Sequence, residues 1–544
     1  MDTKKEQERA ELHRTIWEIA NDLRGAVSGW DFKQYVLGMM FYRFISENIT
    51  NSINKNEHDS GYTDFNYANL SDEEANQDDV REDIINEKGF FILPSQLFEN
   101  VIKNADEDKL NITLGEIFKS IESSANGKPS EKNIKGLFAD VDVNSSRLGK
   151  TDKEKNARLK KIMVSIKNWK IGNYSDNTID AFGDAYEYLM GMYAADGGKL
   201  GGEFFTPQEV SELLVRLTLI DFTNKKVDEN GNVTDVPYKS NVANVYDPAC
   251  GSGSLLLKYA KFLGKDNIEG FYGQEINLTT FNLARINMFL HDISYDRFNI
   301  AYGDTLISPD KDLLTLKENE KIKIDAVVSN PPYSIKWDGD KNPLLASDKR
   351  FNPATVLAPK SNADYAFIMH ILYLLSQSGT AAIVEFPGIL YRKGAEATIR
   401  KYLVRENLID SIIQLPKDLF FGTTISTVVM MLRKNKANDN KILFVDASNE
   451  FVKAGKGNKL NSENINKILD VIRFKKEEKN FSKYVSYDEI VGKGYNLSVN
   501  TYVEKEDKRE VINIKELNTE ISSIVHKTNY LRNSIDQIVK EIEN

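Results

Sequence analysis

The tetrapeptide Asn330-Pro331-Pro332-Tyr333 follows the apolar run IDAVV and Ser329, and its residue types suggest chemistry. Each proline fixes its own φ and biases the preceding residue away from helix, so Asn330 and the Pro331 carbonyl are held in fixed directions. Two hydrogen-bond acceptors then face one small space beside the flat ring of Tyr333. This arrangement predicts a receptor for a planar group that carries an NH2, although an Asn-Pro-Pro turn can also be purely structural.

An upstream stretch, YDPACGSGSLL, ends another apolar run. Asp247 closes a predicted strand there. Gly251 and Gly253 permit a tight turn that a ligand can approach closely, and Ser254 opens a helix with free backbone N–H groups. Taken alone the motif does not identify its ligand. A Gly-x-Gly turn also begins many nicotinamide and flavin domains, and the third glycine of the dinucleotide pattern is absent here.

Two further predicted strands end at carboxylates. Glu275 ends the run FYGQE, and a carboxylate at that point can accept both hydroxyls of a ribose. Asp304 ends the run AYGD, where a polar side chain can hold an adenine amino group. Each residue alone is equally well explained as a solvated strand end or a helix N-cap, so the prediction depends on their joint occurrence.

The elements that must position these residues alternate between short apolar strands and helices from about Val242 onward. Such alternation predicts an α/β fold with a parallel sheet covered by helices on both faces. Three later runs, IDSIIQL, STVVMMLR and KILFVDA, are expected to extend the sheet. In an open sheet of this kind, ligands bind beyond the carboxyl ends of the strands, where the residues above would meet.

The first part of the chain, residues 1–170, is predicted to be helical. Apolar residues recur there at helical spacing, namely Leu12, Ile16, Ile19, Leu23, Tyr35, Met39 and Tyr42. The stretch from residue 51 to residue 83 has no such period and predicts a long polar loop or mobile segment.

The C-terminal residues 511–544 carry a pattern of their own. Their apolar positions alternate by four and three residues, which is typical of a coiled-coil seam: Leu517, Ile521, Ile524, Leu531, Ile535, Ile538 and Ile542, with Thr528 between. A terminal helix packed on its own domain would show the same pattern. We favour a helical arm that pairs with another chain, after a small region at residues 451–510.

The bulk composition narrows the class of protein. With 544 residues, 41% hydrophobic and 28% charged, and a single cysteine, the chain is typical of a globular protein in a reducing compartment. It lacks a signal-peptide pattern and any apolar run near the ~18 residues of a membrane span, so we expect a cytoplasmic protein without membrane contact. The five histidines have no metal-like spacing, so no metal site is assigned.

Together the motifs resemble a known family. SNPPY resembles the catalytic motif of amino-group DNA methyltransferases, DPACGSGSLL looks like their S-adenosylmethionine motif, and the upstream GGEFFTP resembles their additional cofactor motif. This order is similar to the gamma class of N6-adenine methyltransferases. The helical N-terminal part, GEFFTP, NMFLHDI and FFGTTISTVVMMLR further resemble the modification subunit of type I restriction-modification systems.

The resemblance implies a Rossmann-like S-adenosylmethionine-dependent methyltransferase domain at residues 171–450, between the helical N-terminal domain and the C-terminal regions. The target adenine would be flipped out of DNA and stacked on Tyr333. The implied catalytic residues are Asn330, Pro331, Pro332 and Tyr333; the implied cofactor-binding residues are Glu203, Phe204, Phe205, Thr206, Pro207, Gln208, Asp247, Gly251, Ser252, Gly253, Ser254, Glu275 and Asp304.

The resemblance also implies partners: double-stranded DNA, a separate specificity subunit joined by two copies of this chain, and restriction-translocase subunits. A net charge of -10 fits a chain that relies on a partner to grip DNA. The motor motif G-x-x-x-x-G-K-[ST] is absent, so the chain is not the translocase. Two alternatives remain open, a methyltransferase acting on a protein glutamine and a catalytically silent subunit that only clamps DNA.

Overall fold

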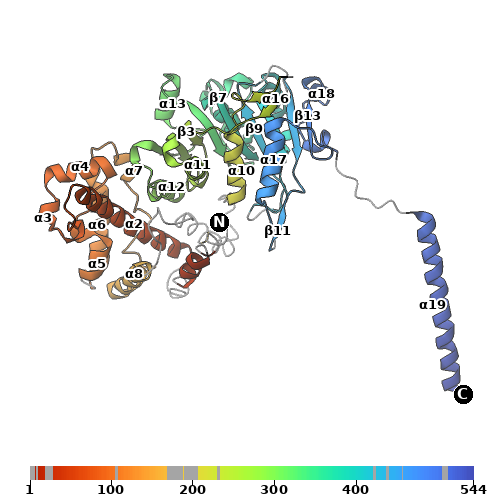
Figure 1. Cartoon of the computed structure of the whole chain (residues 1–544), viewed down its shortest axis with the longest axis horizontal. Helices are drawn as coiled ribbons and strands as arrows, with labels where there is room; N and C mark the ends of the chain where they lie inside the picture. The colour runs from red at the N-terminus through yellow and green to blue at the C-terminus, as the bar shows by residue number, and fades with distance from the viewer. Residues whose placement is uncertain are drawn as a thin grey trace. The chain divides into compact units, whose positions relative to one another are not determined.

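The computed structural model describes residues 7, 10–18, 29–104, 108–167, 188, 206–229, 233–420, 424–436, 440–455, 457–504 and 513–544 (Figure 1). The chain divides into two compact units, Met1–Val503 and Glu504–Asn544. Every helix among the described residues is too short or too polar to span a membrane.

The N-terminal part is helical, as predicted. Its main helices are α2 Gly29–Asp59, α3 Asp72–Ala75, α4 Asp78–Lys88, α5 Phe98–Asn104, α6 Leu110–Ser124, α7 Glu131–Ile134 and α8 Asp152–Lys167. The predicted core positions Leu12, Ile16, Tyr35, Met39 and Tyr42 are all buried. Ile19 and Leu23 lie outside the described residues.

The prediction of a long polar loop at residues 51–83 is wrong. Helix α2 continues to Asp59, and the remainder contains the short 3-10 helix η1 Tyr67–Asn69, all of α3 and the first half of α4. Ser71 and Glu74 form a reciprocal capping box at the start of α3, which satisfies two backbone donors of a short polar helix. Only Ile84 and Ile85 of α4 are buried, so its hydrophobic period is too weak to be recognised.

The second part is built on one nine-stranded sheet of order β13-β10-β8-β9-β7-β6-β3-β4-β5. Its strands are β3 Val242–Asp247, β4 Ile268–Glu275, β5 Phe298–Tyr302, β6 Ile324–Ser329, β7 Leu375–Glu385, β8 Ile409–Gln414, β9 Val428–Arg433, β10 Ile442–Asp446 and β13 Ser482–Val485. Two hairpins stand apart from this sheet, β1 Lys226–Val227 with β2 Val233–Asp235, and β11 Val452–Ala454 with β12 Gly457–Lys459.

The sheet is mixed, which corrects the prediction of a purely parallel one. Strands β5, β4, β3, β6 and β7 are parallel, whereas β9 runs antiparallel to both β7 and β8, and β13 runs antiparallel to β10. No helix is found in the described residues between β8 and β9. Because a parallel pairing needs a crossover connection, usually a helix, the strand returns antiparallel.

Each face of the sheet carries its own apolar core. Val328 and Val384 lie in the core with α10 Gln208–Thr218, α11 Ser254–Leu263, α12 Leu278–Leu290 and α17 Ser462–Phe474. Val327 and Ile383 lie in the opposite core with α13 Lys311–Glu318, α15 Asp364–Leu374, α16 Ala395–Arg405 and α18 Tyr487–Gly492. The alternation along each strand explains why these runs are continuously apolar.

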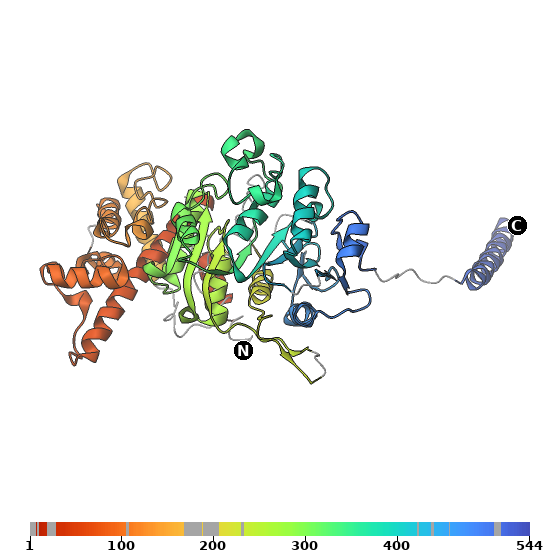
Figure 2. The ribbon, with the colours of Figure 1, turned by 90° about the horizontal axis from the view of Figure 1, so that it is seen from above.

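The N-terminal helices meet the sheet beside α12 and the edge strand β5 (Figure 2). Asn133 Nδ2 donates to the Tyr295 carbonyl at 2.6 Å, and Thr279 Oγ1 donates to Asp140 Oδ1 at 3.1 Å. These polar contacts, together with a shared apolar core, join the helical part to the nine-stranded sheet within one unit.

The C-terminal unit contains α19, Ile514–Glu543, in which no residue is buried. Its predicted seam residues are exposed, from 45% for Leu517 to 78% for Ile542. The predicted C-terminal helix is therefore confirmed, and its apolar stripe has no cover within the described part of its own unit.

Candidate active site

The candidate site lies at the carboxyl ends of β3, β4 and β6. Strand β3 is flanked by β4 on one side and by β6 on the other, so the order of strands reverses at this point. Such a switch point leaves a crevice where ligands bind in open α/β sheets. Asp247 and Glu275 are the last residues of β3 and β4, and Asn330 follows β6 directly.

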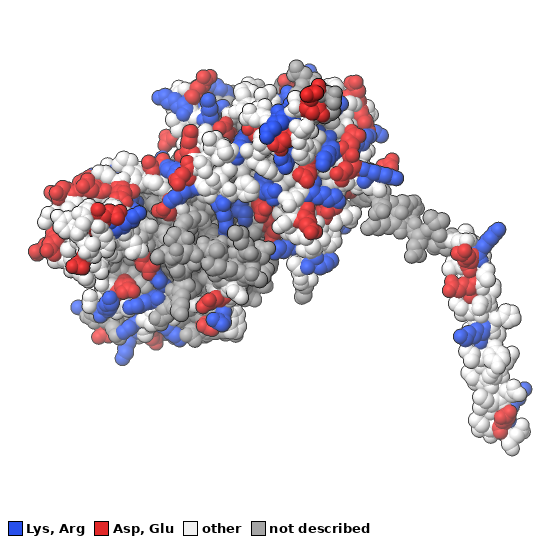
Figure 3. Space-filling model, in the orientation of Figure 1, with Lys and Arg blue, Asp and Glu red and all other residues white. Residues whose placement is uncertain are grey.

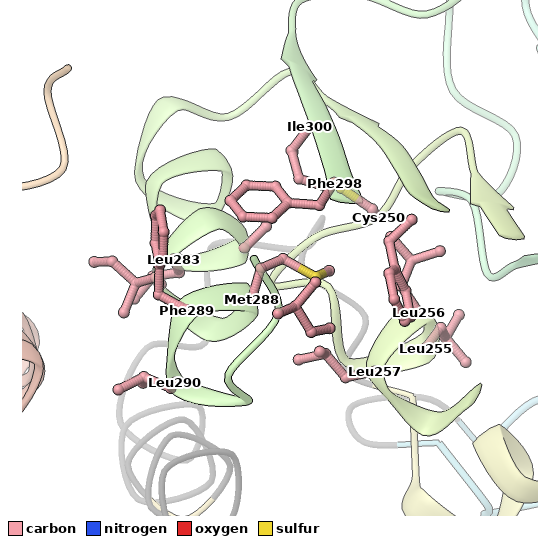
Figure 4. Close-up of a cluster of buried hydrophobic side chains, with 14 of the residues drawn as sticks. Cys250, Leu255, Leu256, Leu257, Leu283, Met288, Phe289, Leu290, Phe298 and Ile300 are labelled. Atoms are coloured by element: carbon pink, nitrogen blue, oxygen red, sulfur yellow. The ribbon is translucent and has the colours of Figure 1, made fainter. Parts of the chain in front are cut away.

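The glycine loop after β3 adopts the predicted tight turn. Gly251 and Gly253 have φ values of 53° and 79°, which favour glycine. A Cβ on Gly253 would lie 3.2 Å from Met288 Cε, so the loop packs closely on α12. Figure 4 shows Met288 in the apolar cluster on which the loop rests. Helix α11 then starts at Ser254 without a side-chain cap, which leaves backbone N–H groups open to a ligand.

Glu275 bridges the loop and the next helix. Its Oε2 accepts a hydrogen bond from the Gly251 N–H at 2.9 Å, and its Oε1 accepts from the Asn277 N–H at 2.8 Å. Each carboxylate oxygen has a further lone pair, so Glu275 can still accept from a ligand hydroxyl. These two hydrogen bonds fix the orientation of the Glu275 carboxylate, which the sequence predicted to bind a ribose.

Asp247 is fully buried and joins β3 to β6. Its Oδ1 accepts from the Ala249 N–H at 3.0 Å and from Ser329 Oγ at 2.8 Å. Its Oδ2 has no hydrogen-bond partner among the described residues. Burial raises the pKa of Asp247 to about 7, and the nearby charge of Glu275 acts in the same direction.

Asp304 lies two residues beyond β5, at a turn. Its Oδ1 accepts from the Leu306 N–H at 2.8 Å, and the next residue, Thr305, donates from Oγ1 to the Pro248 carbonyl at 2.5 Å. The turn that carries Asp304 is therefore tied to the loop after β3.

The predicted catalytic motif, residues 330–333, forms a turn in which the Asn330 amide is hydrogen-bonded through both its nitrogen and its oxygen. Asn330 Nδ2 donates to Thr206 Oγ1 at 3.0 Å, and the Tyr333 hydroxyl donates to Asn330 Oδ1 at 2.5 Å. Burial and the nearby Glu385 and Asp364 raise the pKa of Tyr333 well above its usual value, so the hydroxyl remains a donor. These bonds fix the amide with its oxygen toward Tyr333.

The turn ends in a left-handed residue that the sequence did not reveal. Ser334 has φ 52°, an uncommon conformation for a residue with a side chain. Its N–H donates to Oδ1 of Asp364 at 2.8 Å, from the first turn of α15. Asp364 is buried, and no local sequence pattern indicates its contact with Ser334, 30 residues away.

The upstream motif is described only in part. Glu203, Phe204 and Phe205 lie outside the described residues, so their predicted role has no structural counterpart here. Thr206 contacts Asn330 as stated above, while Gln208 in the first turn of α10 accepts from Lys258 Nζ of α11 at 2.7 Å. Thr206 thus links the predicted cofactor motif to the predicted catalytic turn.

Comparison with known proteins identifies the family. The N-6 DNA Methylase family model matches residues 177–511, and the HsdM N-terminal domain model matches residues 12–166. The methylase subunit of the type I restriction enzyme MpnII from Mycoplasma pneumoniae is 47% identical over 552 residues, which cover 100% of this chain and 98% of that protein. The chain belongs to the type I restriction enzyme methylase subunits.

Other relatives agree. The type I methylase subunit MjaVIII from Methanocaldococcus jannaschii is 34% identical over 359 residues, covering 65% of this chain and 58% of that protein. The crystal structure of a type I restriction-modification methyltransferase subunit from Streptococcus thermophilus matches with a TM-score of 0.77 and 31% identity, covering 91% of this chain and all of that one.

Membership in the type I methylase subunits confirms the predicted fold class and the predicted class of enzyme, an N6-adenine DNA methyltransferase with a methyltransferase fold of the S-adenosylmethionine-dependent kind. The comparisons support this interpretation and not the glutamine methyltransferase or the silent clamp. The roles of individual residues and the predicted domain bounds stay predictions.

Proposed function

We propose that this type I methylase subunit transfers a methyl group from S-adenosylmethionine to adenine N6, in a DNA sequence that a separate specificity subunit selects. This modification would protect host DNA from restriction. The observation that carries the proposal is the orientation of Asn330, whose amide oxygen accepts from Tyr333. Its neighbour Ser329 is bonded to Asp247 at the end of β3.

The cofactor side fits S-adenosylmethionine. Bound there, the cofactor supplies a methyl group that its sulfonium already activates. The charge of Glu275 raises the pKa of the Asp247 carboxyl, and a cationic ligand between them would relieve that repulsion. We assign the ribose to Glu275, the adenine amino group to Asp304, and polar contacts to residues 251–254. By family resemblance, residues 203–208 also contribute to cofactor binding.

The base side fits an amino group on a planar ring. The lone pair of adenine N6 is delocalised into the ring, so the nitrogen is a poor nucleophile. Asn330 Oδ1 and the Pro331 carbonyl would accept its two hydrogens, favour a pyramidal nitrogen and stabilise the positive charge that develops. Because an amide oxygen has two lone pairs, Asn330 can keep its bond to Tyr333 meanwhile. The methylated nitrogen then loses one proton to water.

The target nitrogen is out of reach inside a base stack. The adenine must therefore be rotated out of the duplex, and Tyr333 offers a ring for it to stack on. The φ angles of Pro331 and Pro332 are already fixed, so the backbone of the turn loses little conformational freedom when the base binds. The chain thus contributes alignment and hydrogen bonding, with no strong base required.

The surface charge supports the proposal that other subunits bind most of the DNA. The chain has 71 Lys and Arg against 81 Asp and Glu, and Figure 3 shows both signs interspersed on the face drawn. A protein that gripped DNA alone would present a basic surface. We therefore propose that a specificity subunit joined by two copies of this chain holds the DNA in the cytoplasm, with restriction-translocase subunits adding to that core.

The exposed stripe of α19 supports pairing with another chain. Its seam residues are large and aliphatic, and all are exposed within their unit. A seam with this spacing is buried when a second helix lies along it. We propose that residues 511–544 form a pairing arm, that residues 451–510 lead to it, and that residues 1–170 and 171–450 form the helical and methyltransferase domains.

A transfer assay tests this function. The full chain, assembled with its specificity subunit, is incubated with methyl-labelled S-adenosylmethionine, duplex DNA and a protein extract. The proposal expects label in DNA, recovered after hydrolysis as N6-methyladenine. Label in protein glutamine instead, or calorimetry showing no binding of S-adenosylmethionine, would overturn it.

A further inference from the structure

A connecting segment, residues 335–363, runs from the catalytic turn to α15 and is closed at its base. The Ala363 N–H donates to the Ile335 carbonyl at 3.0 Å, and the Trp337 N–H donates to the Lys360 carbonyl at 3.1 Å. Its two ends are therefore fixed next to the catalytic turn. Arg350, in the middle of the segment, is only 3% exposed.

Arg350 uses its guanidinium group to hold the turn after Asp304. Its two terminal nitrogens donate to the carbonyls of Thr305 and Leu306, each at 2.8 Å. The charge is balanced by Asp348, which accepts from Arg350 at 2.7 Å. Only a planar group with several fixed donors can make this set of contacts, so lysine is not equivalent here.

A buried histidine extends the network to β3. His370 Nδ1 lies 3.1 Å from an Arg350 nitrogen, and His370 Nε2 lies 2.8 Å from the Tyr246 hydroxyl. Arginine can only donate, so Nδ1 must be the acceptor, and a neutral ring then carries its proton on Nε2. Burial and the charge of Arg350 lower the pKa of His370 well below its usual value, which agrees with a neutral ring.

The hydrogen bonds of Arg350 and His370 therefore reach the proposed cofactor site at two places. Tyr246 immediately precedes Asp247 in β3, and Thr305 immediately follows Asp304. The Thr305 hydroxyl also holds the Pro248 carbonyl, within the loop after β3. Hydrogen bonds therefore connect residues 335–363 with the turn at Asp304 and with the C-terminal end of β3.

We infer that Arg350 is a positioning residue for the cofactor: it holds the Asp304 turn against the glycine loop from the segment that follows the catalytic motif. The inference rests on the proposed function, since it assigns the Asp304 turn to the adenine of S-adenosylmethionine. It specifies where the effect of Arg350 must fall, on the affinity for the cofactor and not on the transfer step.

A merely structural role predicts something different. A buried arginine that only supports folding would lower the thermal midpoint and the amount of active protein, and the molecules that remained folded would bind the cofactor normally. A positioning role changes the dissociation constant of the folded molecules. Calorimetry separates the two, because stoichiometry reports the folded fraction and the isotherm reports the affinity.

The test compares the full-length wild type with Arg350→Lys by titration with S-adenosylmethionine, followed by kinetics in the assembled complex. We expect the dissociation constant and the KM for the cofactor to rise about tenfold, which corresponds to the loss of one or two hydrogen bonds. At saturating cofactor, kcat should stay within about twofold. An unchanged dissociation constant, or a fall in kcat with unchanged KM, would overturn the inference.

Two further variants make the test decisive. Thr305→Val removes only the bond to Pro248 and should weaken cofactor binding severalfold, so it tests the same connection if Arg350→Lys does not fold. Arg285→Lys is the matched control, because Arg285 is also buried and its side chain donates to backbone carbonyls of the helical N-terminal part, those of Lys132 and Lys135. Its dissociation constant should equal that of the wild type.

The wild-type titration separates failure of this inference from failure of the proposed function. No binding by the wild type would contradict the proposed function itself. Binding by the wild type together with equal binding by Arg350→Lys and Thr305→Val would leave that function standing and contradict only the role of Arg350.

Discussion

The proposed catalytic turn, residues 330–334, and helix α19 differ in whether their side chains have partners within their own unit. In the turn, Asn330 uses both amide atoms in hydrogen bonds, and Ser334 is held by a buried carboxylate from α15. In α19 no residue is buried, and aliphatic side chains along one stripe face outward. The hydrogen bonds of the turn are complete within its own unit, whereas the apolar stripe of the helix has no covering surface within the described part of its own unit.

We therefore expect catalysis and assembly to be separable in this chain. Substitutions in the turn should change transfer and leave association intact, and substitutions in the helix should do the reverse.

The largest effect is expected for Asn330→Ala. Loss of one acceptor for the N6 hydrogens should lower kcat roughly a hundred- to a thousandfold, a magnitude typical of a removed charge-stabilising hydrogen bond. Affinity for S-adenosylmethionine should be retained. Asn352→Ala is the matched control, since Asn352 also precedes a proline but is exposed. Equal turnover of Asn330→Ala and the wild type would contradict the assignment of the turn.

A charge in the helical stripe should break assembly. Ile524→Lys with Leu531→Lys places two charges in the apolar seam, and we expect at least about a hundredfold weaker association with the specificity subunit, measured by analytical ultracentrifugation. Ser522→Lys with Asn533→Lys adds the same charges to the opposite face and should have little effect. Equal weakening by both pairs would argue against a seam, and cofactor binding should be unchanged in all four positions.

Removing the support of the turn should have a smaller effect on transfer. Asp364→Ala deprives the Ser334 N–H of its acceptor, so the left-handed turn is less well held, and we expect about a tenfold lower kcat. Asp364→Asn keeps an acceptor oxygen and should recover most of the rate. A loss that Asn does not recover would show that the charge, and not the hydrogen bond, is required.

The smallest expected effect is the dependence of stability on the protonation of Asp247. The pKa of Asp247 is raised to about 7 in the folded chain, so the folded state keeps this proton over a range where the unfolded state has lost it. Its contribution to stability is therefore fully present below about pH 4 and lost as pH rises through about 7. The urea midpoint of the wild type should fall relative to that of Asp247→Asn between those values. A difference that does not vary with pH would contradict the raised pKa.

The positions of the site residues along the chain could be predicted because they depend on local pattern. Apolar runs of strand length end at Asp247, Glu275 and Ser329, and the strands β3, β4 and β6 end at the same residues. The φ angle of proline is fixed and glycine allows a positive φ, so the turns at residues 251–253 and 330–333 were also predictable.

The contacts that orient the site could not be predicted, because they join residues far apart in the sequence. Thr206 reaches Asn330, and Arg350 reaches Thr305, across elements whose packing no local period encodes. The direction of β9 was missed for a related reason, since a strand has the same residue pattern whether it pairs parallel or antiparallel.

The most direct test of the separation between catalysis and assembly is nucleoside mass spectrometry on DNA incubated with S-adenosylmethionine, with this chain alone and with the specificity subunit added. We predict N6-methyladenine only when the specificity subunit is present, with cofactor bound in both cases. The same yield of N6-methyladenine from the chain alone would contradict this account, because the unit that contains the catalytic turn would then need no partner.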